Sequence, residues 1–413
     1  MTVTERPASE DYVSEVVPSQ ARRNGINVFV VWIGFIIVVG IMAVGGGLAA
    51  QMDLRSLLTA ILLGNLVLAT FAAFSGYIGA RSGQTFNQLM SDVFPGWSWR
   101  LVSLYAPLVL VGWFGVEAAI FGNLIGEIFD LSVPARRVSM ASVTLMFAVT
   151  SYLGFNAIRM ASTFLVPLIV AIGLFGIYKA AQTGSAQFGF GNTTLSVAEG
   201  MQIVHGTWIM GVLTCLPDLT RFCRSRLSGA LIGAIGIFLA NGFSLLVGAF
   251  AAGLAGDHDP ARILVSFGFI PLAVILALAN IWTTNDNNMY SAALNVARLG
   301  GVSRRQAVVM CAIVASAFAA CDPTSIGVLF GFLGFMGNTA PALGGVVLGA
   351  YVWNCRTSPE TRSAGAAWLG WILGSATSVL VGGALAVPAG FFIGFATWLC
   401  ATRIRNMATA AQS

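Results

Sequence analysis

Long apolar stretches alternate with short polar connections along the whole chain. A membrane-spanning helix needs about 20 mostly apolar residues, and this criterion divides the chain into twelve predicted spans. They are 26–50, 55–79, 99–128, 138–156, 159–182, 199–219, 228–255, 271–297, 304–320, 325–351, 364–384 and 386–403. The stretch 259–269 is too short to cross, so we expect an outer helix there. The pattern predicts an all-α polytopic membrane protein.

The distribution of basic residues sets the expected orientation. With the N-terminus in the cytoplasm, the outer connections hold only Arg55, Arg136, Arg137, Lys179 and Arg262, and the other arginines fall on the inner side. We therefore expect a cytoplasmic tail over 1–25, one transporter domain over 26–403 and a cytoplasmic tail over 404–413. Residues 1–25 contain no apolar core, which argues against a cleavable signal peptide. The expected location is the cell's inner (plasma) membrane.

Composition excludes several classes of protein. Of the 413 residues, 57% are hydrophobic and 9% are charged, whereas soluble domains carry about 25% charged residues. The net charge of +5 comes from residues in short connections, so no nucleic-acid partner is expected. The six Cys form no CxxC pair and only two His are present, which argues against a metal cofactor or a membrane enzyme. A channel would need polar residues lining several spans.

Two spans contain residues that break helices. The first has Gly40 and Gly45 to Gly47, and the sixth has Gly206, Gly211 and Pro217. Interrupted spans at corresponding positions of two halves indicate a transporter binding site. We therefore predict breaks in helices 1 and 6 of two inverted five-span repeats. The repeats would cover 26–182 and 199–351, with spans 11 and 12 appended over 364–403.

The segment "NIWTTNDNNMY", residues 280–290, concentrates polar groups inside the eighth span. A helix turns 100° per residue, which places five polar side chains within an arc of about 100°. Hydrogen bonds between helices would account for one or two of them, so the set indicates a cavity or an ion site. These residues are Asn280, Thr283, Thr284, Asn287 and Ser291.

The eighth and first spans together predict a cation site. The Asn280 carbonyl and the Thr283 and Thr284 hydroxyls would form half of an oxygen shell, and a broken first span would supply further carbonyls. Neutral oxygens favour Na⁺ over a divalent cation, which usually takes carboxylates. Proton coupling stays open, because Glu117, Asp218 and Asp286 are acidic residues in predicted spans or at their ends.

Two tryptophans lie where a flat ligand could be held. Trp113 is midway along the third span and Trp208 is at the predicted break of the sixth. Tryptophan usually lies at the membrane interface, so two at mid-depth are unusual. Besides simple packing, the pattern is typical of aromatic faces that stack on a planar ring. Such a slot suits a heterocycle better than an amino acid.

Four motifs resemble a known family. "NIWTTNDN", "GWFGV", "SQAR" before the first span and "APALGG" in the tenth are similar to the cytosine permease branch of the nucleobase:cation symporters. The resemblance covers about residue 18 to beyond residue 350. It implies a leucine-transporter-type inverted repeat and Na⁺-coupled import of nucleobases or related heterocycles.

The resemblance also implies roles for particular residues. The implied Na⁺ ligands are the carbonyls of Gly34, Ile37 and Asn280 and the hydroxyls of Thr283 and Thr284. The implied substrate contacts are Trp113, Trp208 and Asn280, and we expect Thr207 and Asn285 to contribute as well.

Three positions depart from the family pattern. Leu110 stands where cytosine permeases have an amide, Met210 stands where a small hydroxyl residue is expected, and Glu117 has no expected counterpart. We predict a monomeric symporter that imports a nucleobase, cytosine in the first place, with Na⁺. The open alternatives are another planar heterocycle, such as a hydroxymethylpyrimidine, a purine or a hydantoin-like ring, and coupling to protons.

Overall fold

The computed structural model of the chain describes residues 15–153, 167–175, 178, 182, 190, 194–255, 257, 259–354 and 363–410. Its helices, in chain order, are α1 (Gly25–Ile36), α2 (Val39–Ala49), α3 (Leu54–Ser82), α4 (Phe86–Val93), α5 (Ser98–Ile128), α6 (Val133–Leu153), α8 (Val197–Thr220), α9 (Arg226–Gly236), α10 (Gly242–Ala255), α11 (Pro260–Ser266), α12 (Ile270–Gly300), α13 (Arg304–Ala320), α14 (Ile326–Asn354), α15 (Ala364–Val381) and α16 (Gly383–Ala410). A short 3₁₀ helix, η1 (Ser19–Ala21), precedes α1, and a π-helix, η2 (Ile237–Asn241), joins α9 to α10.

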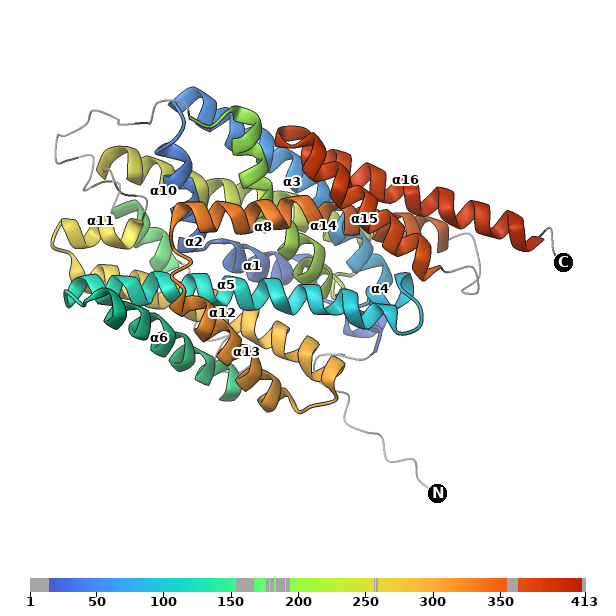
Figure 1. Ribbon diagram of the computed structural model, residues 1–413, viewed down its shortest axis with the longest axis horizontal. Helices are drawn as coiled ribbons and strands as arrows, with labels where there is room; N and C mark the ends of the chain where they lie inside the picture. Colours follow the sequence, from blue (N-terminus) through green and yellow to red (C-terminus); the bar gives the residue numbers. More distant parts are fainter. Residues whose placement is uncertain are drawn as a thin grey trace, which may run out of the picture.

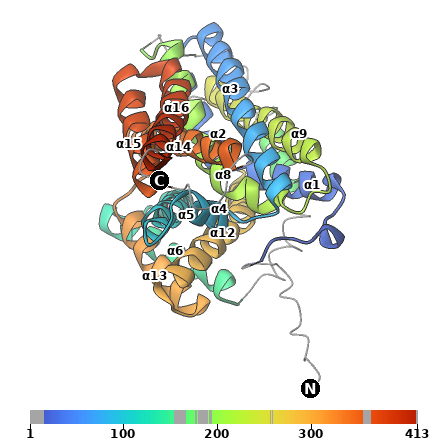
Figure 2. The ribbon, with the colours of Figure 1, turned by 90° about the vertical axis from the view of Figure 1, so that its right-hand side faces the viewer.

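Most of the long helices run along the longest axis of the molecule (Figure 1). Viewed nearly end-on, they form three groups, and α2 and α8 lie near the middle of the molecule (Figure 2). Helices α5, α6, α12 and α13 pack together, α14 packs with α15 and α16, and α3 packs with α8 and α9. The apolar side chains buried between these groups form one large cluster, which makes the described helices a single packed unit.

The predicted spans agree closely with the observed helices. Each predicted span coincides with one or more helices, except 159–182, which lies largely outside the described residues. The short helix expected in 259–269 is α11, and α16 continues past the predicted end of the last span to Ala410. Over the described residues, six helices are long and apolar enough to cross a membrane, or up to eight spans if two bent pairs count as one each. The total of twelve spans stays a prediction.

The first span is broken, as predicted, but not at its glycines. α1 ends at Ile36 and α2 begins at Val39, and the two helices meet at an angle of 53°. Ile37 and Val38 between them have extended backbone. The glycines lie inside α2, and at Gly45 the absence of a Cβ allows α10 to approach. A Cβ on Gly45 would lie 2.0 Å from the Leu245 carbonyl oxygen.

The prediction of a break in the sixth span is wrong. α8 is one continuous helix, with Pro217 inside its last turn. Pro217 removes one backbone hydrogen bond, the one to the Leu213 carbonyl, and the helix continues through it to Thr220. Gly206 serves close packing, since a Cβ there would lie 2.4 Å from the Leu333 carbonyl oxygen of α14.

The contact between α2 and α10 predicts a strong effect of one methyl group. A Cβ on Gly248 would lie 1.7 Å from the Met42 carbonyl oxygen, so one helix must move. We expect Gly248→Ala to lower the free energy of unfolding by about 1–3 kcal/mol, the usual range for overpacking. Thermal denaturation of the detergent-purified protein measures this. Gly331→Ala, at a position with nothing within 4 Å of an added Cβ, is the matched control, and equal destabilisation of both variants would contradict the contact.

The "SQAR" motif and the residue after it bind the N-terminal segment to the helical bundle. Its first three residues form η1. Arg22 donates from its guanidinium to the Ala80 carbonyl at 2.6 Å, and the Arg23 N–H donates to the Phe222 carbonyl at 2.6 Å. Val17 is 1% exposed. The predicted tail is therefore docked from about Val17 onward, at the ends of α3 and α8.

Candidate functional site

Both predicted tryptophans border one small cavity. Trp113 comes from the middle of α5 and Trp208 from the middle of α8, and the cavity has a volume of about 30 Å³. The polar groups on its wall are Glu117, Thr207, Cys215, Thr284 and Asn288, and the apolar part of the wall includes Phe35, Val38, Ile41, Val109, Leu110 and Met210. Helices α1, α2, α5, α8 and α12 therefore meet at this point.

Each of the two indoles packs edge-on against other aromatic rings. Trp208 meets Phe35 edge-on, with ring centroids 5.1 Å apart, and meets Trp32 edge-on at 5.7 Å. Trp113 meets Phe332 edge-on at 5.6 Å. A space of about 30 Å³ holds about two waters and is too small for an aromatic ring. The walls must therefore separate before a heterocycle can enter.

The carbonyls predicted to bind a cation lie at and near the break after α1. The last four carbonyls of a helix have no partner within it, and a helix carries partial negative charge at its C-terminus. Gly34 lies in this last turn of α1 and Ile37 is the cap residue. α1 contacts α12, and Val38 of the break lines the same cavity as Thr284 of α12, so the break and this polar segment belong to the same region.

Of the predicted ligands on α12, Thr284 is the one whose side chain can be placed. It is 2% exposed, lines the cavity beside Val38, and its hydroxyl has no hydrogen-bond partner among the described residues. A buried hydroxyl without a partner is costly, so a cation is a fitting partner for it. Asn280 and Thr283 lie on α12, but their side chains fall outside the described part of the chain.

The polar residues of α12 divide among three faces. Thr284 and Asn288, one turn apart, face the cavity. The Asn285 amide donates to the Phe114 carbonyl of α5 at 3.3 Å and accepts from Asn288 at 3.4 Å. Asp286 accepts a hydrogen bond from the Ser151 hydroxyl of α6 at 2.9 Å. The structure therefore brings Trp113, Trp208, Thr207 and Thr284 together, whereas Asn285 is joined to α5 and does not line the cavity.

A buried polar network backs the cavity and was not anticipated. The Asn241 amide of the π-helix donates to Asn65 of α3 at 2.8 Å and to the Thr207 hydroxyl at 3.0 Å. That hydroxyl also donates to the Val204 carbonyl at 2.6 Å, so its hydrogen-bonding capacity is largely used. The sequence feature that could have indicated this network is the single Asn within each of two apolar stretches, Asn65 and Asn241. Amide side chains in membrane helices usually form hydrogen bonds to neighbouring helices.

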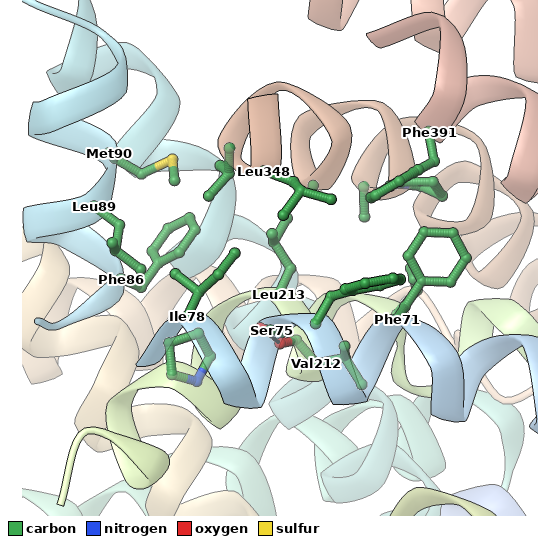
Figure 3. Close-up of a pocket in the computed structure, with 17 residues that line it drawn as sticks. Phe71, Ser75, Ile78, Phe86, Leu89, Met90, Val212, Leu213, Leu348 and Phe391 are labelled. Carbon is green, nitrogen blue, oxygen red and sulfur yellow. Dashed lines mark hydrogen bonds between the residues drawn. The ribbon is translucent and has the colours of Figure 1, made fainter. Parts of the chain in front are cut away.

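A second cavity, of about 40 Å³, lies on the other side of α8 and is apolar. Its wall combines residues of α3, α4, α8, α14 and α16, and Figure 3 shows the rings of Phe71, Phe86 and Phe391 around it. The Ser75 hydroxyl on this wall donates to the Val212 carbonyl at 2.6 Å. A polar heterocycle would find little hydrogen bonding there, so the cavity between the tryptophans is the better candidate.

Comparisons with known proteins agree with this architecture. The family described as "Permease for cytosine/purines, uracil, thiamine, allantoin" matches residues 16–364. The cytosine permease of Escherichia coli (strain K12) is 29% identical over 351 residues, which cover 82% of this chain and 80% of that protein.

Two solved structures of one transporter share the fold. The inward-facing conformation of Mhp1 has a TM-score of 0.79 at 18% identity, covering 94% of this chain and 92% of that one. The second structure shows Mhp1, a nucleobase-cation-symport-1 family transporter, in a closed conformation with bromovinylhydantoin bound. It has a TM-score of 0.75 at 19% identity and covers 93% of both chains.

Proposed function

The chain belongs to the family of permeases for cytosine, purines, uracil, thiamine and allantoin, and we infer from this membership that it imports a nucleobase together with Na⁺. Cytosine is the first candidate for this nucleobase. It is a multi-pass membrane transporter of the nucleobase and cation type. Within this proposal it acts as a monomer in the inner membrane with both termini in the cytoplasm.

The observation that carries this function is the position of Trp113 and Trp208 on one small cavity at mid-length of α5 and α8. Stacking on an aromatic ring is worth about 1–3 kcal/mol per base and suits any planar heterocycle. Polar groups on the same wall can meet the edge of the ring. Such a mostly apolar site with a few convergent polar groups is typical of small-molecule binding.

Coupling follows from the position of the break between α1 and α2. A cation held by the Gly34 and Ile37 carbonyls and by Thr284 would tie α1 to α12 beside the cavity. It would thereby favour the conformation in which the substrate site is complete. A ligand shifts such an equilibrium only as far as it binds one state better than the other. Na⁺ and the heterocycle would then each raise the affinity of the other.

A different heterocycle is the second candidate. Leu110 and Met210 both line the cavity and stand at positions where the resemblance to cytosine permeases leads us to expect polar residues. An apolar wall suits a ring with an apolar substituent. A hydantoin-like ring, a hydroxymethylpyrimidine or a purine therefore competes with cytosine for this assignment.

Ligand-induced thermal stabilisation of the purified protein separates these candidates. We expect cytosine to raise the melting temperature in Na⁺ and to have a much smaller effect when choline replaces Na⁺. A larger effect of another heterocycle would change the assigned substrate and keep the transporter class. Stabilisation by no heterocycle would refute the function.

A further inference from the structure

Three exposed arginines form a patch where the N-terminal segment meets the connection between α8 and α9. This arginine patch consists of Arg23, just before α1, Arg224, and Arg226, the first residue of α9. The Arg23 N–H donates to the Phe222 carbonyl at 2.6 Å, and the Arg224 guanidinium donates to the Arg22 carbonyl at 3.2 Å. Packing of the N-terminal segment therefore brings together basic residues that lie far apart in the sequence.

The arginine patch has no carboxylate partner in the described part of the chain. The ion pairs of Arg136 and Arg262 lie elsewhere, in α6 and α11. The neighbouring Arg221 lies close enough to Asp218 of α8 for the two charges to interact, so its charge is partly offset. The three like charges of the patch repel one another, and an anion between them lowers the electrostatic free energy.

Apolar side chains that can face lipid begin directly after the arginine patch. Helices α1 and α9 pack side by side (Figure 2), and a Cβ on Gly25 would lie 2.2 Å from the Ser228 hydroxyl oxygen. The exposed large apolar residues along this pair are Ile26 and Val30 of α1, Leu227, Leu231 and Ile235 of α9, and Leu239 of η2. A helix from Leu227 to Leu239 is about 18 Å long, which slightly exceeds half of a hydrocarbon core of about 30 Å.

We propose that the arginine patch binds the headgroup phosphate of an anionic phospholipid, whose acyl chains lie along α1 and α9. Each basic residue near the membrane surface raises the affinity for anionic lipid about fivefold. Arginine suits a phosphate because its planar guanidinium can form two parallel hydrogen bonds to it. A neutral lipid leaves the charges unused, and a free phosphate leaves the apolar residues unused. The bound lipid ties the N-terminal segment and the start of α1 to α9.

Thermal stabilisation of the full chain, purified in a neutral detergent, tests this binding. Phosphatidylglycerol should raise the melting temperature more than the same amount of phosphatidylcholine with the same acyl chains. Glycerol 3-phosphate, which carries the phosphate without the chains, should have no effect. Adding choline chloride at constant Na⁺ should reduce the preference for phosphatidylglycerol, because salt screens the attraction between exposed charges.

Replacing the arginines locates the site. The triple variant Arg23→Gln, Arg224→Gln and Arg226→Gln should need about a hundredfold more phosphatidylglycerol for the same stabilisation, which is about fivefold for each charge. The triple lysine variant at the same positions keeps the charges and should retain most of the preference. Arg226→Gln alone removes a side chain with no hydrogen bond to the described residues and should cost about fivefold. It keeps the test decisive if the triple variant does not fold.

A matched control removes the same charge from other connections. Arg55→Gln, Arg137→Gln and Arg305→Gln lie before α3, in α6 and in α13, and together they should leave the preference for phosphatidylglycerol unchanged. Equal stabilisation by phosphatidylcholine, or by glycerol 3-phosphate, would overturn the lipid site. An unchanged preference in Arg226→Gln and in the triple glutamine variant would do the same. None of these outcomes depends on which heterocycle is transported.

Discussion

Replacing Trp113 with alanine is expected to weaken binding of the transported heterocycle about ten- to a hundredfold. The loss corresponds to about 1–3 kcal/mol for one base stacked on one aromatic ring, and Trp113 lines the cavity with 9% of its surface exposed. Trp113→Phe keeps an aromatic face and should retain most of the affinity. Equilibrium binding of labelled cytosine to the purified protein measures both.

Trp97 provides the matched control for this experiment. It precedes α5, is 69% exposed and does not line the cavity, so Trp97→Ala should bind cytosine as the wild type does. If Trp113→Ala also binds normally, the cavity between the tryptophans is not the substrate site.

Replacing Thr284 with alanine is expected to raise the Na⁺ concentration required for substrate binding about ten- to a hundredfold. Hydrogen bonds and contacts to charged groups are worth about 1.5–3 kcal/mol, and the Thr284 hydroxyl is buried with no hydrogen-bond partner among the described residues. Titrating Na⁺ at fixed cytosine and following thermal stabilisation measures the shift. Cytosine affinity at saturating Na⁺ should change much less.

Two variants distinguish loss of a ligand from loss of packing. Thr284→Ser keeps the hydroxyl and should restore the Na⁺ requirement of the wild type. Thr59→Ala removes a hydroxyl that donates to the Arg55 carbonyl on an exposed face of α3 and should change nothing. An unaltered Na⁺ requirement in Thr284→Ala would remove this residue from the cation site.

The hydrophobic pattern was sufficient to locate the helices, because span length in a bilayer is fixed by the thickness of the hydrocarbon. The predicted span 304–320 coincides with α13, and 99–128 differs from α5 by one residue at its start. Helix breaks were predicted less well. A glycine can mark either a break or a close contact between helices, and the sequence does not show which helix lies opposite. Gly45 and Gly206 both serve contacts, whereas the real break lies at Ile37 and Val38, which have no breaker character.

The aromatic and acidic residues of the site were visible in the sequence, but their partners were not. Mid-span positions singled out Trp113, Trp208 and Glu117, and all three line one cavity. What the polar side chains of α12 contact depends on the helices packed around α12. Asn288 is not among the five residues of the predicted polar arc but lines the cavity, and Asn285 was expected to contact substrate but bonds to α5. A helical arc predicts which residues share a face, and the packing of α5 and α6 decides what each face meets.

Uptake of labelled cytosine by liposomes containing the purified protein tests the central claim most directly. The pH should be equal on both sides of the membrane. Uptake with an inward Na⁺ gradient should be compared with uptake when choline replaces Na⁺ at the same ionic strength. Coupling through the break between α1 and α2 predicts accumulation of cytosine above the external concentration with Na⁺ and no accumulation with choline. Equal uptake in the two conditions would contradict Na⁺-coupled import.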